Sequence, residues 1–168
     1  RHLFRSAMRM RPDRVIIGEV RGGEALDMIQ AMVSGHKGSM PTTHASTPRE
    51  TLARLETLSM MGDVEMPLHA LRNQLALALD VIVQVARFHD GSRKITHISE
   101  VLDLDREGRY QTRDLFVFRG QGKDEDGHIL GQLEPTGLLP SFSEELTVSG
   151  YKLPDAMIAA ARRRKEQS

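Results

Sequence analysis

The first half of the chain has a hydrophobic pattern that switches repeatedly between two periods. Segments with an apolar residue at every third or fourth position predict one-faced helices, and short β-branched runs predict strands. The continuously apolar run Val15-Ile16-Ile17 indicates a strand that is buried on both faces. We expect helices over 2–10, 24–34, 48–61 and 67–79, and strands over 14–18, 38–43 and 80–85. This alternation predicts an α/β arrangement through about residue 88.

Proline, glycine and capping residues mark the ends of these helices. Pro12 ends the first helix, because proline has no backbone donor and restricts the residue before it. Gly35 is a stop signal just after the second helix. Thr47, Pro48 and Glu50 begin the third helix with a hydroxyl cap, a proline at the first helical position and a capping-box acid.

The second half of the chain has short strands separated by polar turns. Asp90-Gly91 and Glu107-Gly108 are hairpin turn signals. We expect strands over 94–102, 110–118 and 128–133 and short helices over 142–146 and 154–164. The predicted organisation is an α/β core over 1–88, β-hairpins over 89–119, and a last hairpin with a helical tail over 120–168.

Composition narrows the classes of function. The 168 residues include 23 basic and 23 acidic side chains, which argues against a nucleic-acid binder that relies on bulk positive charge. The sequence has no cysteine, so disulfides and thiolate zinc sites are excluded, as suits a reducing compartment. No apolar run approaches the roughly 20 residues that cross a bilayer.

Candidate chemistry lies at the ends of two predicted strands. Glu19 ends the first strand, which is where open α/β folds place their ligands. His44 follows the next strand, so both side chains are expected at the same edge of the sheet, where a histidine can donate to a phosphate oxygen. The alternatives are a core strand that ends in a solvated acid and a histidine that satisfies a loop carbonyl.

Several charged residues near these strands have two possible roles. Arg21 either neutralises phosphate charge or pairs with Glu24 or Asp13, and Arg54 either reaches a phosphate or forms a surface salt bridge. Asp13 precedes the strand and is read as a turn residue. The run Arg162-Arg163-Arg164-Lys165 can contact acidic lipid or a partner, but a solvated helix end is the preferred reading. A metal site made by protein ligands alone is not expected, because His36 and His44 lack ligand spacing.

Taken together, these residues resemble the secretion ATPase superfamily of type II and type IV secretion, and within it the CpaF-like ATPases of Flp (tight-adherence) pilus assembly. The resemblance rests on Arg9-Met10-Arg11-Pro12-Asp13-Arg14, Val15-Ile16-Ile17-Gly18-Glu19-Val20-Arg21, Glu24-Ala25, Ser34-Gly35-His36-Lys37-Gly38-Ser39 and Thr42 with His44-Ala45. It extends to Arg54-Leu55-Glu56, Asp80-Val81-Ile82-Val83-Gln84, Arg93, Thr96-His97-Ile98-Ser99-Glu100-Val101 and Asp114-Leu115-Phe116. It is strongest over residues 3–119.

The resemblance implies a RecA-like P-loop NTPase core with a mostly parallel sheet flanked by helices, followed by a β-meander and a helical tail. It implies an ATP- and Mg²⁺-dependent homohexameric motor at the cytoplasmic face of the inner membrane, held there by membrane platform proteins. The neutral charge adds the expectation that it binds no nucleic acid. Glu19 would be the Walker B acid, holding Mg²⁺ directly or through water, and Arg21 would belong to its surroundings. His44 would be the centre of the histidine box that senses the γ-phosphate, and Arg54 a nucleotide contact.

The sequence departs from the family pattern in two ways. It contains no G-x-x-x-x-G-K-[ST] phosphate loop and no acidic Asp box, so we expect it to be the C-terminal portion of a longer ATPase, inactive on its own. Pro41 stands where such proteins usually have serine, in a strand that leads to His44. The alternative function is a non-catalytic ring or assembly subunit, which a true absence of the phosphate loop would favour. A DNA motor is disfavoured by the neutral charge and the few aromatic residues.

Overall fold

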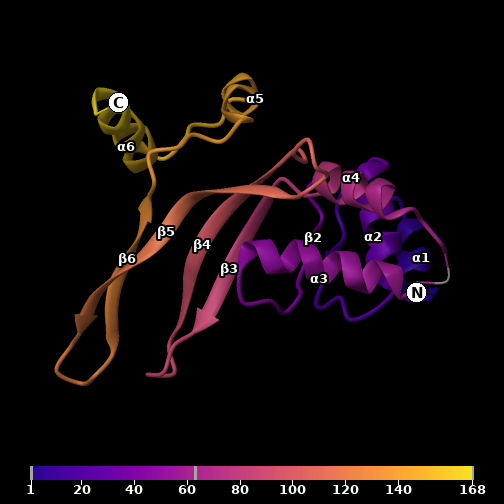
Figure 1. The fold of residues 1–168 in the computed structure, drawn as a ribbon, viewed down its shortest axis with the longest axis horizontal. Helices are drawn as coiled ribbons and strands as arrows, with labels where there is room; N and C mark the ends of the chain where they lie inside the picture. Colours follow the sequence, from indigo (N-terminus) through magenta and orange to yellow (C-terminus); the bar gives the residue numbers. More distant parts are fainter. Residues whose placement is uncertain (1, 63, 168) are drawn as a thin grey trace. The chain divides into compact units, whose positions relative to one another are not determined.

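The structure is a computed structural model that describes residues 2–62 and 64–167 (Figure 1). It divides into two compact units. The first comprises Arg1–Asp80 and Val101–Gln111, and the second comprises Val81–Glu100 and Thr112–Ser168. None of the helices in the described part is long and apolar enough to cross a membrane.

The first unit is built around three helices. These are α2 (Glu24–Val33), α3 (Pro48–Met60) and α4 (Leu68–Ala78), which pack on one another. A shorter helix, α1 (His2–Met8), precedes them. Their apolar stripes are buried as the sequence predicts, and the largest fully buried apolar side chains of the core are Leu26, Met28, Ile29, Leu52, Leu55, Leu71 and Leu75. The helices predicted from periodicity are therefore confirmed, with ends that differ by a few residues.

The two strands of the first unit are short and parallel. Strand β1 (Ile16–Ile17) pairs with β2 (Met40–Pro41). Two backbone hydrogen bonds join these segments. The Met40 N–H donates to the Val15 carbonyl at 3.0 Å, and the Thr42 N–H donates to the Ile17 carbonyl at 3.1 Å.

Pro41 fits this pairing, because successive backbone donors of a strand point to opposite sides. The donors that face β1 belong to Met40 and Thr42, so the donor that Pro41 lacks would point away from β1. Proline at this position therefore leaves the path to His44 intact.

The expectation of a strand buried on both faces is wrong for the described residues. The strand predicted over 14–18 shortens to two residues, and the Ile16 side chain is 73% exposed. The residue that is buried lies further on, at Val20, whose N–H donates to the Thr42 carbonyl at 2.8 Å. A single neighbouring strand cannot cover the apolar run as the two flanking layers of a parallel sheet would.

The predicted helix start at residues 47–50 is confirmed. The Glu50 N–H donates to Thr47 Oγ1 at 3.2 Å, and Pro48 occupies the first turn. The Glu50 carboxylate accepts from the Ser46 N–H at 3.2 Å, one residue before the cap. Both ends of this turn are thereby fixed directly after His44.

The second unit contains a four-stranded antiparallel meander in the order β3-β4-β5-β6 (Figure 1). Its elements are β3 (Val81–Arg87), β4 (Arg93–Leu102), β5 (Gln111–Lys123), β6 (Ile129–Pro135), α5 (Ser143–Val148) and α6 (Asp155–Glu166). The predicted meander and helical tail are confirmed. The strand predicted over 80–85 begins the antiparallel sheet and does not extend the parallel pair. The described residues therefore form a mostly antiparallel sheet and a separate parallel pair, in place of the mostly parallel sheet that the resemblance implies.

A buried carboxylate ties the segment after β6 to this sheet. Glu100 on β4 is 1% exposed, and its carboxylate accepts from Arg113 Nε on β5 at 2.6 Å. The Ser141 N–H donates to the same carboxylate at 2.8 Å, and the Ser141 hydroxyl donates to it as well. Arg113 also donates to the Leu139 carbonyl at 3.1 Å. The charge of Glu100 is thus fully compensated despite its burial.

We predict that Glu100→Gln lowers the free energy of unfolding by about 2 kcal/mol near neutral pH, because a neutral amide leaves Arg113 without its charged partner. Burial raises the pKa of Glu100, but the hydrogen bonds from Ser141 and Arg113 outweigh burial and leave the pKa below its ordinary value. The stabilisation is therefore present above the unfolded-state pKa and is lost as the pH falls through the folded-state pKa.

Urea unfolding of the wild type and the variant, near neutral pH and near pH ~3, checks this prediction. The difference between the two proteins should shrink in acid. An equal difference in unfolding free energy at both pH values would contradict the charged state assigned to Glu100. Glu134→Gln, at an exposed position of β6, is the matched control and should unfold like the wild type at both values.

Candidate functional site

The candidate site lies where the two parallel strands end. Glu19 follows β1 and His44 follows β2, so parallel pairing brings both to one edge. The Glu19 Oε1 atom lies 3.2 Å from His44 Nε2, and Oε2 is ion-paired with the Arg21 guanidinium. The Glu19 side chain is 25% exposed, whereas those of His44 and Arg21 are 78% and 76% exposed. The prediction that the two strand ends meet is confirmed.

The surroundings of Glu19 favour its charged form. The hydrogen bond from Arg21 lowers the pKa of Glu19, partial burial opposes this shift, and the charges of Arg21, His44 and Arg54 lower the pKa further. The same contact raises the pKa of Arg21. The site therefore presents a carboxylate with basic side chains around it at ordinary pH.

Arg54 contributes to this site through its charge alone. It lies on α3, its side chain is exposed, and within residues 2–62 and 64–167 it forms no ion pair. Its effect on the pKa of Glu19 shows that it is close enough to add positive potential there. The structure thus brings Glu19, Arg21 and His44 into direct contact and leaves Arg54 at the rim. Its predicted phosphate contact stays a prediction.

Glu24 closes the turn that carries Arg21. The Glu24 Oε1 atom accepts from the Arg21 N–H at 2.8 Å and from the Gly22 N–H at 3.0 Å. Sequence reasoning offered Glu24 or Asp13 as partners of the Arg21 side chain, but that side chain pairs with Glu19 and only the Arg21 backbone contacts Glu24. An acid at the first helical position after two glycines was the available signal for this role.

A glycine allows this turn to lie against the end of α3. A Cβ atom on Gly23 would lie 2.7 Å from the Gly62 Cα atom, so the backbones approach too closely for any other residue. The start of α2 and the end of α3 are therefore locked together in the first unit. Because α2 starts just after Glu19 and α3 starts just after His44, the close approach also restricts the two site residues.

A second contact network in the first unit involves Glu56 on α3. The Glu56 carboxylate accepts from Arg72 Nε at 2.8 Å, from Arg72 Nη2 at 3.3 Å and from the Tyr110 hydroxyl at 3.0 Å. Burial and the Glu56 hydrogen bond raise the pKa of Tyr110, so its hydroxyl stays a donor. No local sequence pattern indicates this network, because Glu56 and Tyr110 lie far apart along the chain.

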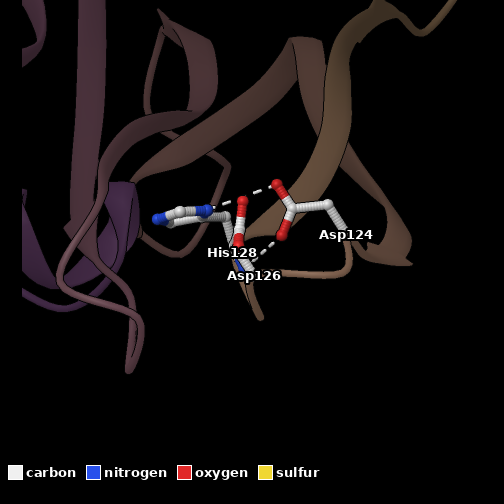
Figure 2. Close-up of side chains that lie close together, drawn as sticks. All are labelled: Asp124, Asp126 and His128. Carbon is white, nitrogen blue, oxygen red and sulfur yellow. Dashed lines mark hydrogen bonds and ion pairs between the residues drawn. The ribbon is translucent and has the colours of Figure 1, made fainter.

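A further group of possible metal ligands lies far along the chain from Glu19, at the turn between β5 and β6. Figure 2 shows Asp124, Asp126 and His128 close together, and all three are exposed. The Asp124 carboxylate accepts from the His128 N–H at 2.8 Å and lies 3.2 Å from His128 Nδ1. These contacts close a hairpin turn that contains Gly127 with a φ of 84°, which accounts for the cluster without an ion.

We predict that Glu24→Ala lowers the free energy of unfolding by about 1 kcal/mol, because two backbone donors of the turn lose their acceptor. Glu24→Gln keeps an acceptor oxygen in the same place and should lose less than half as much. Urea unfolding near neutral pH measures both. A glutamine variant that is as unstable as the alanine variant would show that Glu24 acts through its charge and not as an acceptor.

Comparison with known proteins identifies the family of this chain. Residues 1–122 match the family described as "Type II/IV secretion system protein". A conjugal transfer protein of Mycobacterium tuberculosis is 43% identical over 111 residues, covering 66% of this chain and 30% of that protein. The conjugal transfer protein TrbB of Rhizobium radiobacter is 35% identical over 129 residues, covering 76% and 36% respectively.

A solved structure agrees with these relatives. The crystal structure of the VirB11 ATPase from the Brucella suis type IV secretion system, in complex with sulphate, superposes with a TM-score of 0.54 at 38% identity, covering 58% of this chain and 30% of that one. The chain therefore spans about a third of the length of the relatives it matches. The chain belongs to the type II/IV secretion system ATPase family.

Proposed function

We propose that this chain is the C-terminal portion of an ATP-hydrolysing motor that powers pilus assembly or protein secretion across the bacterial inner membrane. The observation that carries the proposal is the ionised Glu19 carboxylate in contact with His44 at the ends of two parallel strands. Such a pair at a strand edge suits phosphoryl transfer, where the protein supplies position and charge more than covalent chemistry.

The residues present fit Mg²⁺ held through water. Both Glu19 carboxylate oxygens already have a partner, Arg21 and His44, yet an ionised carboxylate keeps further lone pairs that can accept from water. Mg²⁺ retains several waters in protein sites, so this chain needs to offer only an acceptor. When bound, the ion neutralises charge on the phosphates of ATP.

The position of each basic residue of the site supports the role that we propose for it. His44 Nε2 lies next to the Glu19 carboxylate and its side chain is mostly exposed, so it is free to donate to a γ-phosphate oxygen. When His44 exchanges the Glu19 carboxylate for a γ-phosphate oxygen as its acceptor, it senses that the γ-phosphate is present. Arg21 holds Glu19 in its charged form, and Arg54 at the rim adds positive potential toward the phosphates.

The rest of the nucleotide site would come from a part of the protein outside this sequence. The chain matches about a third of the length of its relatives, and its two parallel strands are too few to form a stable sheet alone. We propose that this pair belongs to a larger RecA-like sheet with a phosphate-binding loop. We further propose a homohexamer of CpaF-like, Flp pilus type, at the cytoplasmic face of the inner membrane and attached through platform proteins. The block over residues 9–21 and the segment over residues 42–45 support that subtype.

We predict that Glu19→Gln in the full-length protein abolishes ATP hydrolysis and leaves ATP binding within about twofold, because the amide cannot supply the charge but fills the same space. Steady-state phosphate release measures hydrolysis, and equilibrium binding of a fluorescent ATP analogue measures affinity. Glu134→Gln removes the same charge at an exposed position of β6 and should change neither.

Sustained turnover by Glu19→Gln would contradict the role assigned to Glu19. If the wild-type protein binds ATP and releases no phosphate, the motor proposal itself is wrong. The chain would then be a non-catalytic ring subunit.

A further inference from the structure

A second concave site lies in the second unit, between the end of β6 and the last turns of α6. It is a cavity that is open to solvent, with a volume of about 490 Å³. It is lined by Pro135, Thr136, Gly137, Ala160, Arg163, Arg164 and Gln167. These residues lie beyond residue 122, where the family match ends.

The walls of this cavity are held by close backbone contact. Gly137 has a φ of 85°, and a Cβ atom there would lie 3.0 Å from the Ala160 carbonyl oxygen and 3.1 Å from the Arg164 Cβ atom. Arg164 Nη1 donates to the Thr136 carbonyl at 3.3 Å. The turn after β6 and the helix are thus fixed against one another, and a larger residue at Gly137 would force them apart.

The cavity is lined by positive charge. Arg163 and Arg164 border it, and no carboxylate side chain is among the lining residues. Within the described part of the chain, Arg163 forms no ion pair. Cations in the last turn of a helix offset the helix dipole, which accounts for basic residues at this end of α6 but not for a concave surface that gathers two of them.

We propose that this cavity binds a phosphate group. The planar guanidinium group of Arg163 matches a phosphate with paired N–H donors, and Arg164, whose Nη1 also donates to the Thr136 carbonyl, adds a second positive charge. The Gln167 amide lies in the same lining. The phosphate belongs either to a small soluble anion or to an anionic phospholipid headgroup, which share this chemistry. The site is separate from the Glu19 site in the sequence, and its proposal does not depend on ATP hydrolysis.

Two double variants test the proposal in the full-length protein. Arg163→Gln with Arg164→Gln removes two charges from the cavity wall. Arg162→Gln with Lys165→Gln removes two charges from the same helix end but not from the cavity lining. Binding is measured by calorimetry with pyrophosphate in the presence of EDTA, and by cosedimentation with vesicles of phosphatidylglycerol and phosphatidylcholine or of phosphatidylcholine alone.

We expect the cavity variant to bind at least about tenfold more weakly than the wild type, and the control variant to stay within about threefold. Loss of pyrophosphate binding identifies a soluble anion, and loss confined to phosphatidylglycerol vesicles identifies a headgroup. The proposal is overturned if the wild type binds neither probe, if both variants lose affinity equally, or if the cavity variant binds as the wild type does. Should a double variant unfold, Arg163→Gln against Arg162→Gln gives the same comparison.

Discussion

The contact between the Glu19 carboxylate and the basic side chains of Arg21 and His44 is the interaction on which the candidate site depends. An acid with two engaged oxygens stays charged, and the hydrogen bond from Arg21 is the largest reason. The contact requires that β1 and β2 be parallel and in register, since a shift of one residue would turn His44 away from Glu19. The short strand pair therefore sets the geometry of the site.

The helices preserve that geometry. Helix α2 begins at Glu24, which closes the turn before it, and α3 begins at Pro48, a few residues after His44, with a complete cap. The backbone contact of Gly23 with Gly62 restrains the end of α3, and the bonds of Glu56 to Arg72 and Tyr110 restrain its middle. A movement of α3 would therefore shift the segment that carries His44, which suits the γ-phosphate-sensing role that we propose for this residue.

The helices and the two strand ends of the site could be predicted, because they depend on residues close together in the sequence. Features that depend on contacts between distant residues could not. Periodicity and capping located the helices, and the Glu19 and His44 positions followed from strand ends. The exposed Ile16 could not be foreseen, because burial depends on what covers a strand. Glu100 with Ser141, and Glu56 with Tyr110, are pairs far apart in sequence that no local pattern reveals. The sequence alone suggests that Pro41 disrupts its strand. The strand pairing shows that the donors facing β1 belong to Met40 and Thr42, so proline is tolerated between them.

The most direct test of the proposed motor site is a cryo-electron microscopy structure of the full-length protein with Mg²⁺ and a non-hydrolysable ATP analogue. We predict that a γ-phosphate oxygen lies within hydrogen-bond reach of His44 Nε2, about 3 Å, and that Glu19 accepts from a water on the metal. A nucleotide bound away from this edge, with His44 still on Glu19 and no phosphate beside either, would contradict the assignment of these residues.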